Sequence, residues 1–205
     1  MIESQRERVR VLVNVGSGPR EASSLPAYFN SWRQLRVDND ATVHPDLLAD
    51  LTNLAAIPDG SVDAVWAAHC VEHLYAHQVT LALREFRRVL RMDGFACVIV
   101  PDLQSVAQYI AADRMHEPLY WSPAGPITPH DIVFGYGPAV AHGRRSMVHR
   151  CGFTPGILQQ CFQQLSFGEV LLRRRSAQFE LAALARRIPA RDAAERAALV
   201  NALEL

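Results

Sequence analysis

A short motif of histidine and glutamate is the first feature of the sequence that could do chemistry. His69 and His73 flank Glu72 at the spacing H-x-x-E-H. This spacing matches an inverted zinc-peptidase pattern, in which both histidines must lie on one face of a helix to bind the metal. His69, however, directly follows the apolar run 62–68, which predicts a strand. The peptidase interpretation is therefore disfavoured.

The segment 115–150 carries further side chains that could act as a general base. Its prolines and glycines exclude long regular elements, whereas its Tyr, Trp and Phe residues are too many for a disordered linker. Long ordered loops inside a domain are usually functional, so we expect an ordered insertion over the strand ends that forms a ligand pocket. Because imidazoles titrate near neutral pH, His73, His130 and His142 are the candidates for a catalytic base. At least two of His130, His142 and His149 are expected only to bond the backbone.

Two glycines end an apolar, β-branched run, 9–15, that predicts a buried strand. Gly16 and Gly18 let the backbone turn tightly and let a ligand approach closely, since glycine has no Cβ. Asp38 falls 20 residues after Gly18 at the end of a second predicted strand. Nucleotide-binding α/β units place a carboxylate there for the ribose hydroxyls. A plain turn and a solvated aspartate are the alternatives when each feature is taken alone.

The elements around these residues alternate between strands and helices. Further strands are predicted over 34–37, 62–68, 95–100, 167–173 and 179–185, and helices over 27–33, 77–91, 103–113, 154–165 and 190–205, with a turn at 92–94. In the helix 77–91, apolar residues form one stripe, and Arg84, Arg87, Arg88 and Arg91 are expected to form a solvated face. This alternation predicts an α/β fold with a mostly parallel sheet and helices on both faces.

The composition is that of an ordinary globular protein. Of the 205 residues, 49% are hydrophobic and 20% charged, which suits a single domain over residues 1–205. Lys plus Arg and Asp plus Glu both number 21, so no overall field favours nucleic acid or a membrane surface as a partner. The four cysteines form no C-x-x-C pair and the N-terminal residues lack an apolar signal-peptide core, so a reducing, cytoplasmic location is expected. Nothing in the composition predicts an oligomeric state.

Seven motifs follow one another along the chain: Asn14-x-Gly16-x-Gly18, Val37-Asp38, Pro45-Asp46-x-x-Ala49-Asp50-Leu51, Ile57-Pro58-Asp59-x-Ser61-Val62-Asp63, His69-x-x-Glu72-His73-Leu74, Arg88-Val89-Leu90-Arg91-Met92-Asp93-Gly94 and Val100-Pro101-Asp102. In this order they resemble the class I S-adenosylmethionine-dependent methyltransferases, in particular the bacterial group known as type 11. The resemblance implies a Rossmann-like fold whose mostly parallel seven-stranded sheet has an antiparallel last strand. It also implies S-adenosylmethionine as cofactor, S-adenosylhomocysteine as product, and O- or N-methylation of a small-molecule acceptor by in-line transfer.

The same resemblance implies roles for individual residues. Asn14, Gly16, Ser17 and Gly18 would form the loop against the methionine part of the cofactor, Asp38 with Asn39 beside it would bind the ribose, Asp50 and Leu51 would bind the adenine, and His69 would line the sulfonium end. The family usually has an acid at the position of Asn14. Asparagine can still donate and accept hydrogen bonds, so the loop is expected to survive with less charge. The usual Pro-Gly-Gly turn is Met92-Asp93-Gly94 here.

Three alternatives accompany this interpretation. Metal-dependent methyltransferases, among them ubiquinone-pathway O-methyltransferases and plant small-RNA methyltransferases, carry Glu-x-x-Glu-His where this chain has His69-x-x-Glu72-His73. A histidine with a carboxylate could hold a divalent ion, but many relatives carry this element without one, and we expect no metal. An NAD-dependent oxidoreductase is the rival enzyme, although the loop lacks the third glycine of dinucleotide folds. A non-catalytic domain that binds S-adenosylmethionine or a partner protein is the remaining alternative.

Overall fold

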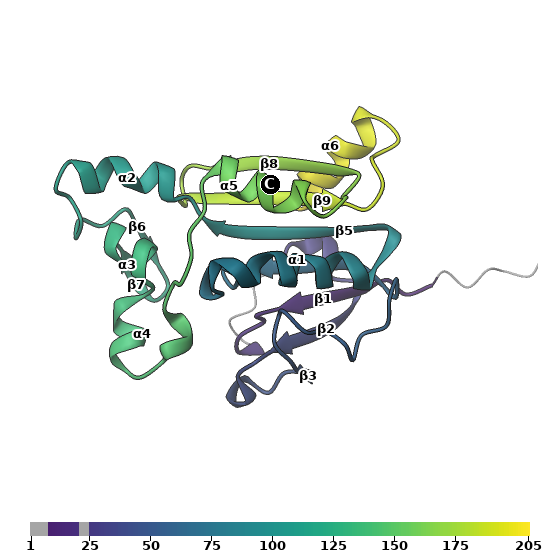
Figure 1. Cartoon of the computed structure of the whole chain (residues 1–205), viewed down its shortest axis with the longest axis horizontal. Helices are drawn as coiled ribbons and strands as arrows, with labels where there is room; N and C mark the ends of the chain where they lie inside the picture. The colour runs from purple at the N-terminus through teal and green to yellow at the C-terminus, as the bar shows by residue number, and fades with distance from the viewer. Residues whose placement is uncertain (1–7, 21–24) are drawn as a thin grey trace, which may run out of the picture.

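The computed structural model describes residues 8–20 and 25–205, and its centre is a seven-stranded sheet of order β3-β2-β1-β4-β5-β9-β8 (Figure 1). The strands are β1 (Val11–Val15), β2 (Arg33–Asp38), β3 (Leu47–Leu48), β4 (Val62–Ala68), β5 (Leu90–Pro101), β8 (Glu169–Arg175) and β9 (Glu180–Arg186). Every pairing is parallel except those that β9 makes with β5 and β8. The predicted α/β fold, with its antiparallel last strand, is confirmed.

The order of the strands changes direction at β1. The chain runs outward from β1 to β2 and β3, and then returns to pair β4 with the other side of β1. In open α/β sheets, ligands bind beyond the carboxyl ends of the strands at such a switch point. The loops that follow β1, β2 and β4 contact one another there, and they carry Gly18, Asn39 and His69 of the predicted cofactor-binding residues.

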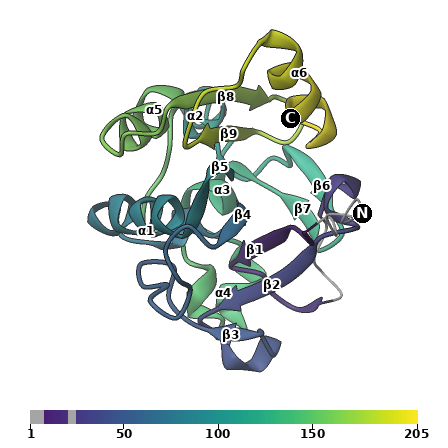
Figure 2. The ribbon, with the colours of Figure 1, turned by 90° about the vertical axis from the view of Figure 1, so that its right-hand side faces the viewer.

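Helices cover both faces of the sheet. α1 (Ala76–Val89) and α5 (Pro155–Gln163) lie on one face, whereas α6 (Ala193–Ala202) and the short 3-10 turn Ala27–Phe29 lie on the other (Figure 2). Phe86 in the apolar stripe of α1 is fully buried, and burial of such a side chain contributes about 2–3 kcal/mol. Of the helices in the described ranges, none is both long and apolar enough to cross a bilayer.

The turn predicted at 92–94 is absent. These residues lie inside β5, which begins at Leu90 directly after α1 and shifts its register against β4 near this point. A Cβ on Gly94 would lie 2.9 Å from the carbonyl oxygen of Asp63. Glycine is therefore required here by the close approach of two strands and not by a turn.

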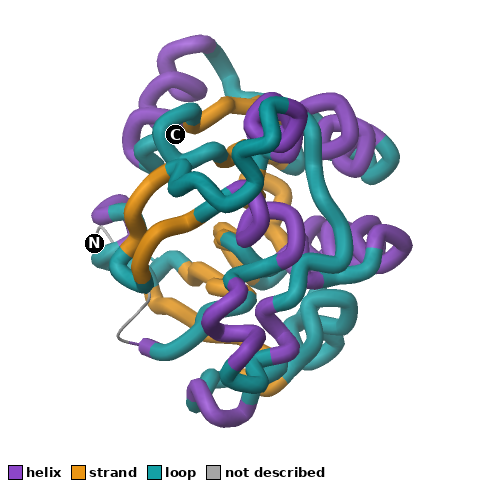
Figure 3. The backbone as a smooth tube through the Cα atoms, turned by 90° about the vertical axis from the view of Figure 1, so that its left-hand side faces the viewer, coloured by secondary structure: helices purple, strands orange, loops and turns teal. Residues whose placement is uncertain are grey.

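The insertion 115–150 folds into short elements beyond the carboxyl ends of the parallel strands (Figures 1 and 3). α2 (Leu103–Ala111) leads into it, and it contains the hairpin β6 (Tyr120–Ser122) and β7 (Gly125–Ile127) and the helices α3 (Pro129–Phe134) and α4 (Gly137–Ala141). Thr128 begins α3 in a reciprocal capping box with Asp131. The prediction that no long regular element forms here is confirmed.

Candidate active site

The glycine loop follows β1 directly, and its two glycines share one backbone conformation. Gly16 has φ 61° and Gly18 has φ 58°, a region that other residues adopt only at a cost. A Cβ on Gly16 would lie 2.4 Å from the Cβ of Cys70, so the segment after β4 packs directly against the loop. Around Gly18, apart from its chain neighbours, no described atom lies within 4 Å of the position that a Cβ would take. The loop is therefore open to a ligand at Gly18.

Asp38 lies beside this loop, as the sequence predicts. Its carboxylate is buried, and Oδ2 accepts a hydrogen bond from the Gly18 N–H at 2.9 Å. Oδ1 accepts from the Asp40 N–H at 3.0 Å. The backbone N–H of Ser17 donates to the carbonyl of Val37 at 3.2 Å, which joins the loop to the end of β2. Asn39 is exposed next to this junction.

Arg36 is a site-forming residue that the sequence did not indicate. Its guanidinium is fully buried and donates to the carbonyl of Gly18, to that of His44 at 2.8 Å, and to that of Val43 at 3.2 Å. The backbone N–H of Arg36 donates to Asp46 at 2.8 Å. One buried cation thus holds the glycine loop and the loop after β2 in fixed positions, and charge-assisted bonds of this kind are the stronger ones.

The predicted adenine-binding pair lies at the end of β3. Ala49 donates its backbone N–H to the carbonyl of Asp38 at 3.0 Å, which places the next residue, Asp50, close to the end of β2. Oδ1 of Asp50 accepts from both the N–H and the hydroxyl of Thr52, whereas Oδ2 has no hydrogen-bond partner within the described residues. Leu51 is buried and Asp50 is exposed.

His69 ends β4 with φ 53°, an uncommon conformation for a residue other than glycine. Its side chain is about half exposed, and Nε2 lies 2.9 Å from Oε1 of Glu180. Nδ1 lies 3.6 Å from Oε1 of Glu72. Partial desolvation opposes the charged ring, but the hydrogen bond to Glu180 and the attraction of the Glu72 and Glu180 carboxylates outweigh it and raise the pKa of His69 to about 10. His69 is therefore an imidazolium at neutral pH.

A cavity of about 160 Å³ begins at His69 and extends under the insertion. Its lining residues come from the strand ends and from the insertion, and they are His69, Glu72, His73, Pro101, Tyr120, Ile127, Asp131, Ile132, Tyr136, Met147, His149, Gln178, Phe179 and Glu180. Tyr120 stacks on Phe179 with ring centroids 6.4 Å apart, and burial raises the pKa of Tyr120 to about 12. Two larger surface depressions, of about 520 and 630 Å³, are lined by none of the predicted site residues.

Two of the histidines that line this cavity lie next to each other. The rings of His73 and His149 are 5.0 Å apart between centroids. Nδ1 of His73 lies 3.1 Å from the carbonyl oxygen of Val148, and Nδ1 of His149 lies 2.8 Å from that of Ile132. Burial lowers the pKa of His149, so this ring is neutral at neutral pH. His149 is the cavity histidine that the sequence analysis did not choose as a base.

The other two predicted bases are not part of the cavity lining. The ring of His130 packs against His116 and Phe134, with centroids 5.4 and 5.0 Å away. His142 is exposed, and its Nδ1 lies 2.7 Å from the carbonyl oxygen of Pro138. The structure therefore brings only His73 of the three candidates to the cavity. The rings of His142 and His149 both bond the backbone, but His149 also lines the cavity, so of the three insertion histidines only His142 behaves as expected.

Comparisons with known proteins show which family and which solved structures this chain is similar to. Residues 28–98 match the methyltransferase domain family. Among solved structures, a SAM-dependent methyltransferase from Archaeoglobus fulgidus is similar with a TM-score of 0.56 and 13% identity, over 86% of this chain and 86% of that one. The 1,6-didemethyltoxoflavin-N1-methyltransferase of Burkholderia thailandensis, solved with 1,6-didemethyltoxoflavin and S-adenosylhomocysteine, is similar with a TM-score of 0.51 and 17% identity, over 89% of this chain and 72% of that one. A search of curated proteins finds no match. At these identities the structural likeness establishes the fold.

Proposed function

We propose that this chain, which has the fold of SAM-dependent methyltransferases and matches a methyltransferase domain family over residues 28–98, transfers the methyl group of S-adenosylmethionine to an oxygen or nitrogen atom of a small-molecule acceptor. One observation carries the proposal: the glycine loop with Asp38 and the cavity at His69 lie at the same end of the sheet. His69 ends β4, which pairs directly with β1, the strand before the glycine loop.

The residues around the glycine loop fit this cofactor. The open space at Gly18 admits a ligand against the backbone. Each oxygen of the Asp38 carboxylate accepts one backbone N–H and keeps capacity for a second bond, so both ribose hydroxyls can donate to it. Oδ2 of Asp50 is available for the amino group of an adenine. These features support the assignment of Gly18, Asp38 and Asp50 to cofactor binding.

In this reaction the main task of the protein is to position the acceptor against the methyl group. Bound S-adenosylmethionine supplies a methyl group on a positive sulfur, and the acceptor's lone pair bonds to that methyl carbon as the carbon–sulfur bond breaks. The cavity is our candidate for the acceptor site, because its lining combines aromatic side chains with polar groups such as Glu72. Because Nδ1 of His73 is bonded to the Val148 carbonyl, Nε2 is the ring atom left to take a proton from an O–H or N–H acceptor. His73 is accordingly our candidate base in place of His130 and His142.

Isothermal titration calorimetry tests the proposal on the full chain. We expect one S-adenosylhomocysteine to bind per chain and NADH not to bind. Asp38→Ala should weaken the binding of S-adenosylhomocysteine by about tenfold to a hundredfold, because a charged acceptor of ribose hydrogen bonds is lost. The matched control is Asp93→Ala, which removes an exposed carboxylate outside the loop and should bind like the wild type. Binding of NADH without binding of S-adenosylhomocysteine would overturn the proposal.

A further inference from the structure

Glu72 is a buried carboxylate with unfilled hydrogen-bonding capacity. The residue is 1% exposed, and neither Oε1 nor Oε2 accepts a hydrogen bond from the described residues. Nδ1 of His69 approaches Oε1 to 3.6 Å, but that ring is bonded through Nε2 to Glu180 at 2.9 Å. A buried carboxylate without hydrogen bonds is costly to the folded state. Glu72 is therefore placed to bind a further group in the cavity.

His73 and His149 lie side by side and use the same ring nitrogen to bond the backbone. The Nδ1 atom of each ring faces a backbone carbonyl, which can only accept, so Nδ1 must carry the proton in both rings. In a neutral ring Nε2 is then the atom with a lone pair. Metal-binding histidines have this arrangement, with the second ring nitrogen donating to a carbonyl or carboxylate that fixes the tautomer and the orientation. One potential ligand atom from each of Glu72, His73 and His149 lies within 4.8 Å of the other two.

The backbone holds these three residues together although they come from two distant segments. Glu72 and His73 lie on the 3-10 turn after β4, and His149 lies at the end of the insertion. The N–H groups of Arg150 and Cys151 donate to the carbonyl of Glu72 at 2.9 and 3.2 Å. The guanidinium of Arg150 donates to the carbonyl of His73 at 3.0 Å. The arrangement is thus fixed before any ligand arrives.

We propose that Glu72, His73 and His149 form a binding site for one divalent transition-metal cation, such as Zn²⁺, Co²⁺ or Mn²⁺. Two imidazoles and one carboxylate suit these cations, whereas Mg²⁺ and Ca²⁺ prefer oxygen ligands alone. Three protein ligands leave further coordination positions open, as in metal sites that bind a substrate. His69 is excluded as a ligand because Glu180 engages its Nε2.

This site differs from the expectation drawn from the sequence, which was that no metal binds. The site also bears on the acceptor, and this inference rests on the proposed methyltransferase function. Glu72, His73 and His149 all line the cavity, so a cation bound by them would be able to hold the acceptor through an oxygen atom and would favour a hydroxyl-bearing small molecule. With a cation bound, His73 would be a metal ligand instead of the base proposed above, and the proton of the acceptor hydroxyl would leave to solvent.

Metal binding to the full chain tests the site without any cofactor. Protein treated with a chelator and exchanged into metal-free buffer is titrated with Zn²⁺ by calorimetry and with Co²⁺ by visible absorption. We expect one ion per chain and Co²⁺ bands that show nitrogen and oxygen ligands. Glu72→Gln and His149→Ala should each lower the affinity by about a hundredfold or more, since loss of an outer-shell partner alone costs 10–100-fold. His77→Ala, which removes an exposed histidine of α1, is the matched control and should bind like the wild type.

Near-UV circular dichroism establishes that each variant is folded, and His149→Ala decides the matter if Glu72→Gln does not fold. Absence of a stoichiometric ion in the wild type, or equal affinity in the wild type and in His149→Ala, would overturn the proposal. Protein from which the metal has been removed with a chelator should still bind S-adenosylhomocysteine, because Gly18 and Asp38 are not among the proposed metal ligands. A failed metal site is therefore distinguishable from a failed cofactor site.

Discussion

Gly16 and Gly18 have nearly the same backbone conformation but different surroundings. Gly16 faces Cys70 so closely that a Cβ would overlap with it, whereas a Cβ on Gly18 would have no atom of the described residues within 4 Å apart from its chain neighbours. The first glycine is therefore required by packing within the protein. The second is placed to let a ligand approach the backbone.

Alanine at each position should separate the two roles. A positive φ costs alanine about 1–2 kcal/mol at either site. At Gly16 the overlap with Cys70 adds about 1–3 kcal/mol, as overpacking does in other cores. Gly16→Ala should therefore lower the free energy of unfolding in urea clearly more than Gly18→Ala. Gly18→Ala should stay folded and lose affinity for S-adenosylhomocysteine in calorimetry. Equal destabilisation of the two variants would contradict this division.

Some residues of the site could be predicted from local sequence patterns, and others could not. Gly16, Gly18 and Asp38 follow strand ends, and parallel strands bring such ends together, so their meeting could be predicted from the sequence. His149 and Glu180 reach Glu72 and His69 only through the path of the insertion and the antiparallel strand β9. No local pattern encodes that path. His130 and His142 had the same residue type as His149 and the same loop context, and only the fold separates them.

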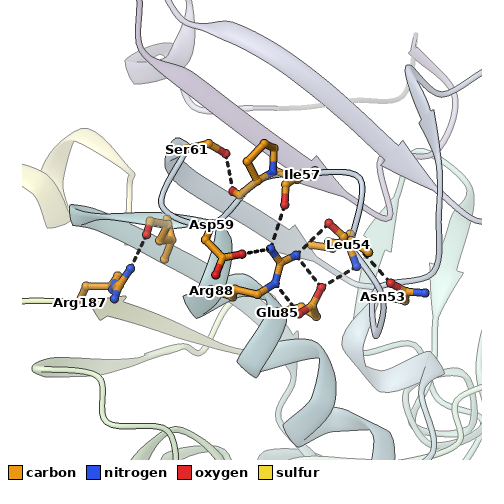
Figure 4. Close-up of polar contacts among 11 residues, drawn as sticks. Asn53, Leu54, Ile57, Asp59, Ser61, Glu85, Arg88 and Arg187 are labelled. Carbon is orange, nitrogen blue, oxygen red and sulfur yellow. Dashed lines mark hydrogen bonds and ion pairs between the residues drawn. The ribbon is translucent and has the colours of Figure 1, made fainter.

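At the scale of the element, the polar side of α1 is not simply a solvated face. Arg88 is partly buried and donates to the carbonyls of Leu54 and Ile57 at 2.9 Å each and to Asp59 (Figure 4). Glu85 completes the group, because it accepts from Arg88 and from the Leu54 N–H at 2.8 Å. The prediction of a solvated arginine face is wrong for Arg88. The helical period showed which side is apolar but not that the loop 54–59 covers part of the other.

The contacts between Glu85 and Arg88 make the free energy of unfolding depend on pH. Hydrogen bonding to Arg88 is the main cause that lowers the pKa of Glu85, with the Leu54 N–H adding to it. A carboxyl group with a lowered folded-state pKa stabilises the protein above its unfolded value of about 4.3, and this contribution is lost as the pH falls through the folded-state value. Glu85→Gln should therefore be less stable than the wild type at pH 7, by about 1–2 kcal/mol. The difference should shrink below about pH 4.

Urea denaturation at pH 7, 5 and 3.5 measures the effect on Glu85→Gln and the wild type. Glu117→Gln is the control, because its carboxylate is exposed and lies 3.7 Å from its arginine partner. That variant should follow the wild type at every pH. A constant gap between Glu85→Gln and the wild type from pH 7 to pH 3.5 would show that the Glu85 carboxylate does not titrate as we expect.

At the scale of the whole molecule, the alternation of strands and helices was enough to predict the class of fold. The spacing of apolar residues and the turn residues predict each strand and helix from local sequence. Because connections between parallel strands are right-handed, the order of these elements then limits how they can form a sheet. The edge strand β3 and the hairpin β6–β7 are too short for such a signal. The docking of the insertion depends on single backbone bonds, such as those from Arg150 and Cys151 to the carbonyl of Glu72, which no sequence pattern marks.

Asp102 joins three parts of the molecule at the point where the chain leaves the sheet for the insertion. It is fully buried, and it caps α2 by accepting from the backbone N–H groups of Gln104 and Ser105 at 3.1 and 3.4 Å. Its Oδ2 also accepts from the Ser105 hydroxyl and pairs with Nε of Arg174 on β8 at 2.6 Å. One carboxylate thus fixes the end of β5, the start of α2 and an edge strand.

Asp102→Ala should therefore destabilise the protein, and it should also loosen the segment 103–150, which contributes residues to the cavity. Loss of the helix cap costs about 1 kcal/mol, and loss of the bond to a charged partner adds about 1.5–3 kcal/mol. The free energy of unfolding in urea should fall by about 2–4 kcal/mol. Hydrogen exchange across 103–150 should speed up more than exchange in β1 and β4, because α2 leads into the insertion. Asp102→Asn is the matched variant: its amide oxygen still caps α2, so it should lose less stability and keep slow exchange in α2. If both variants unfold at the urea concentration of the wild type, Asp102 does not join these parts.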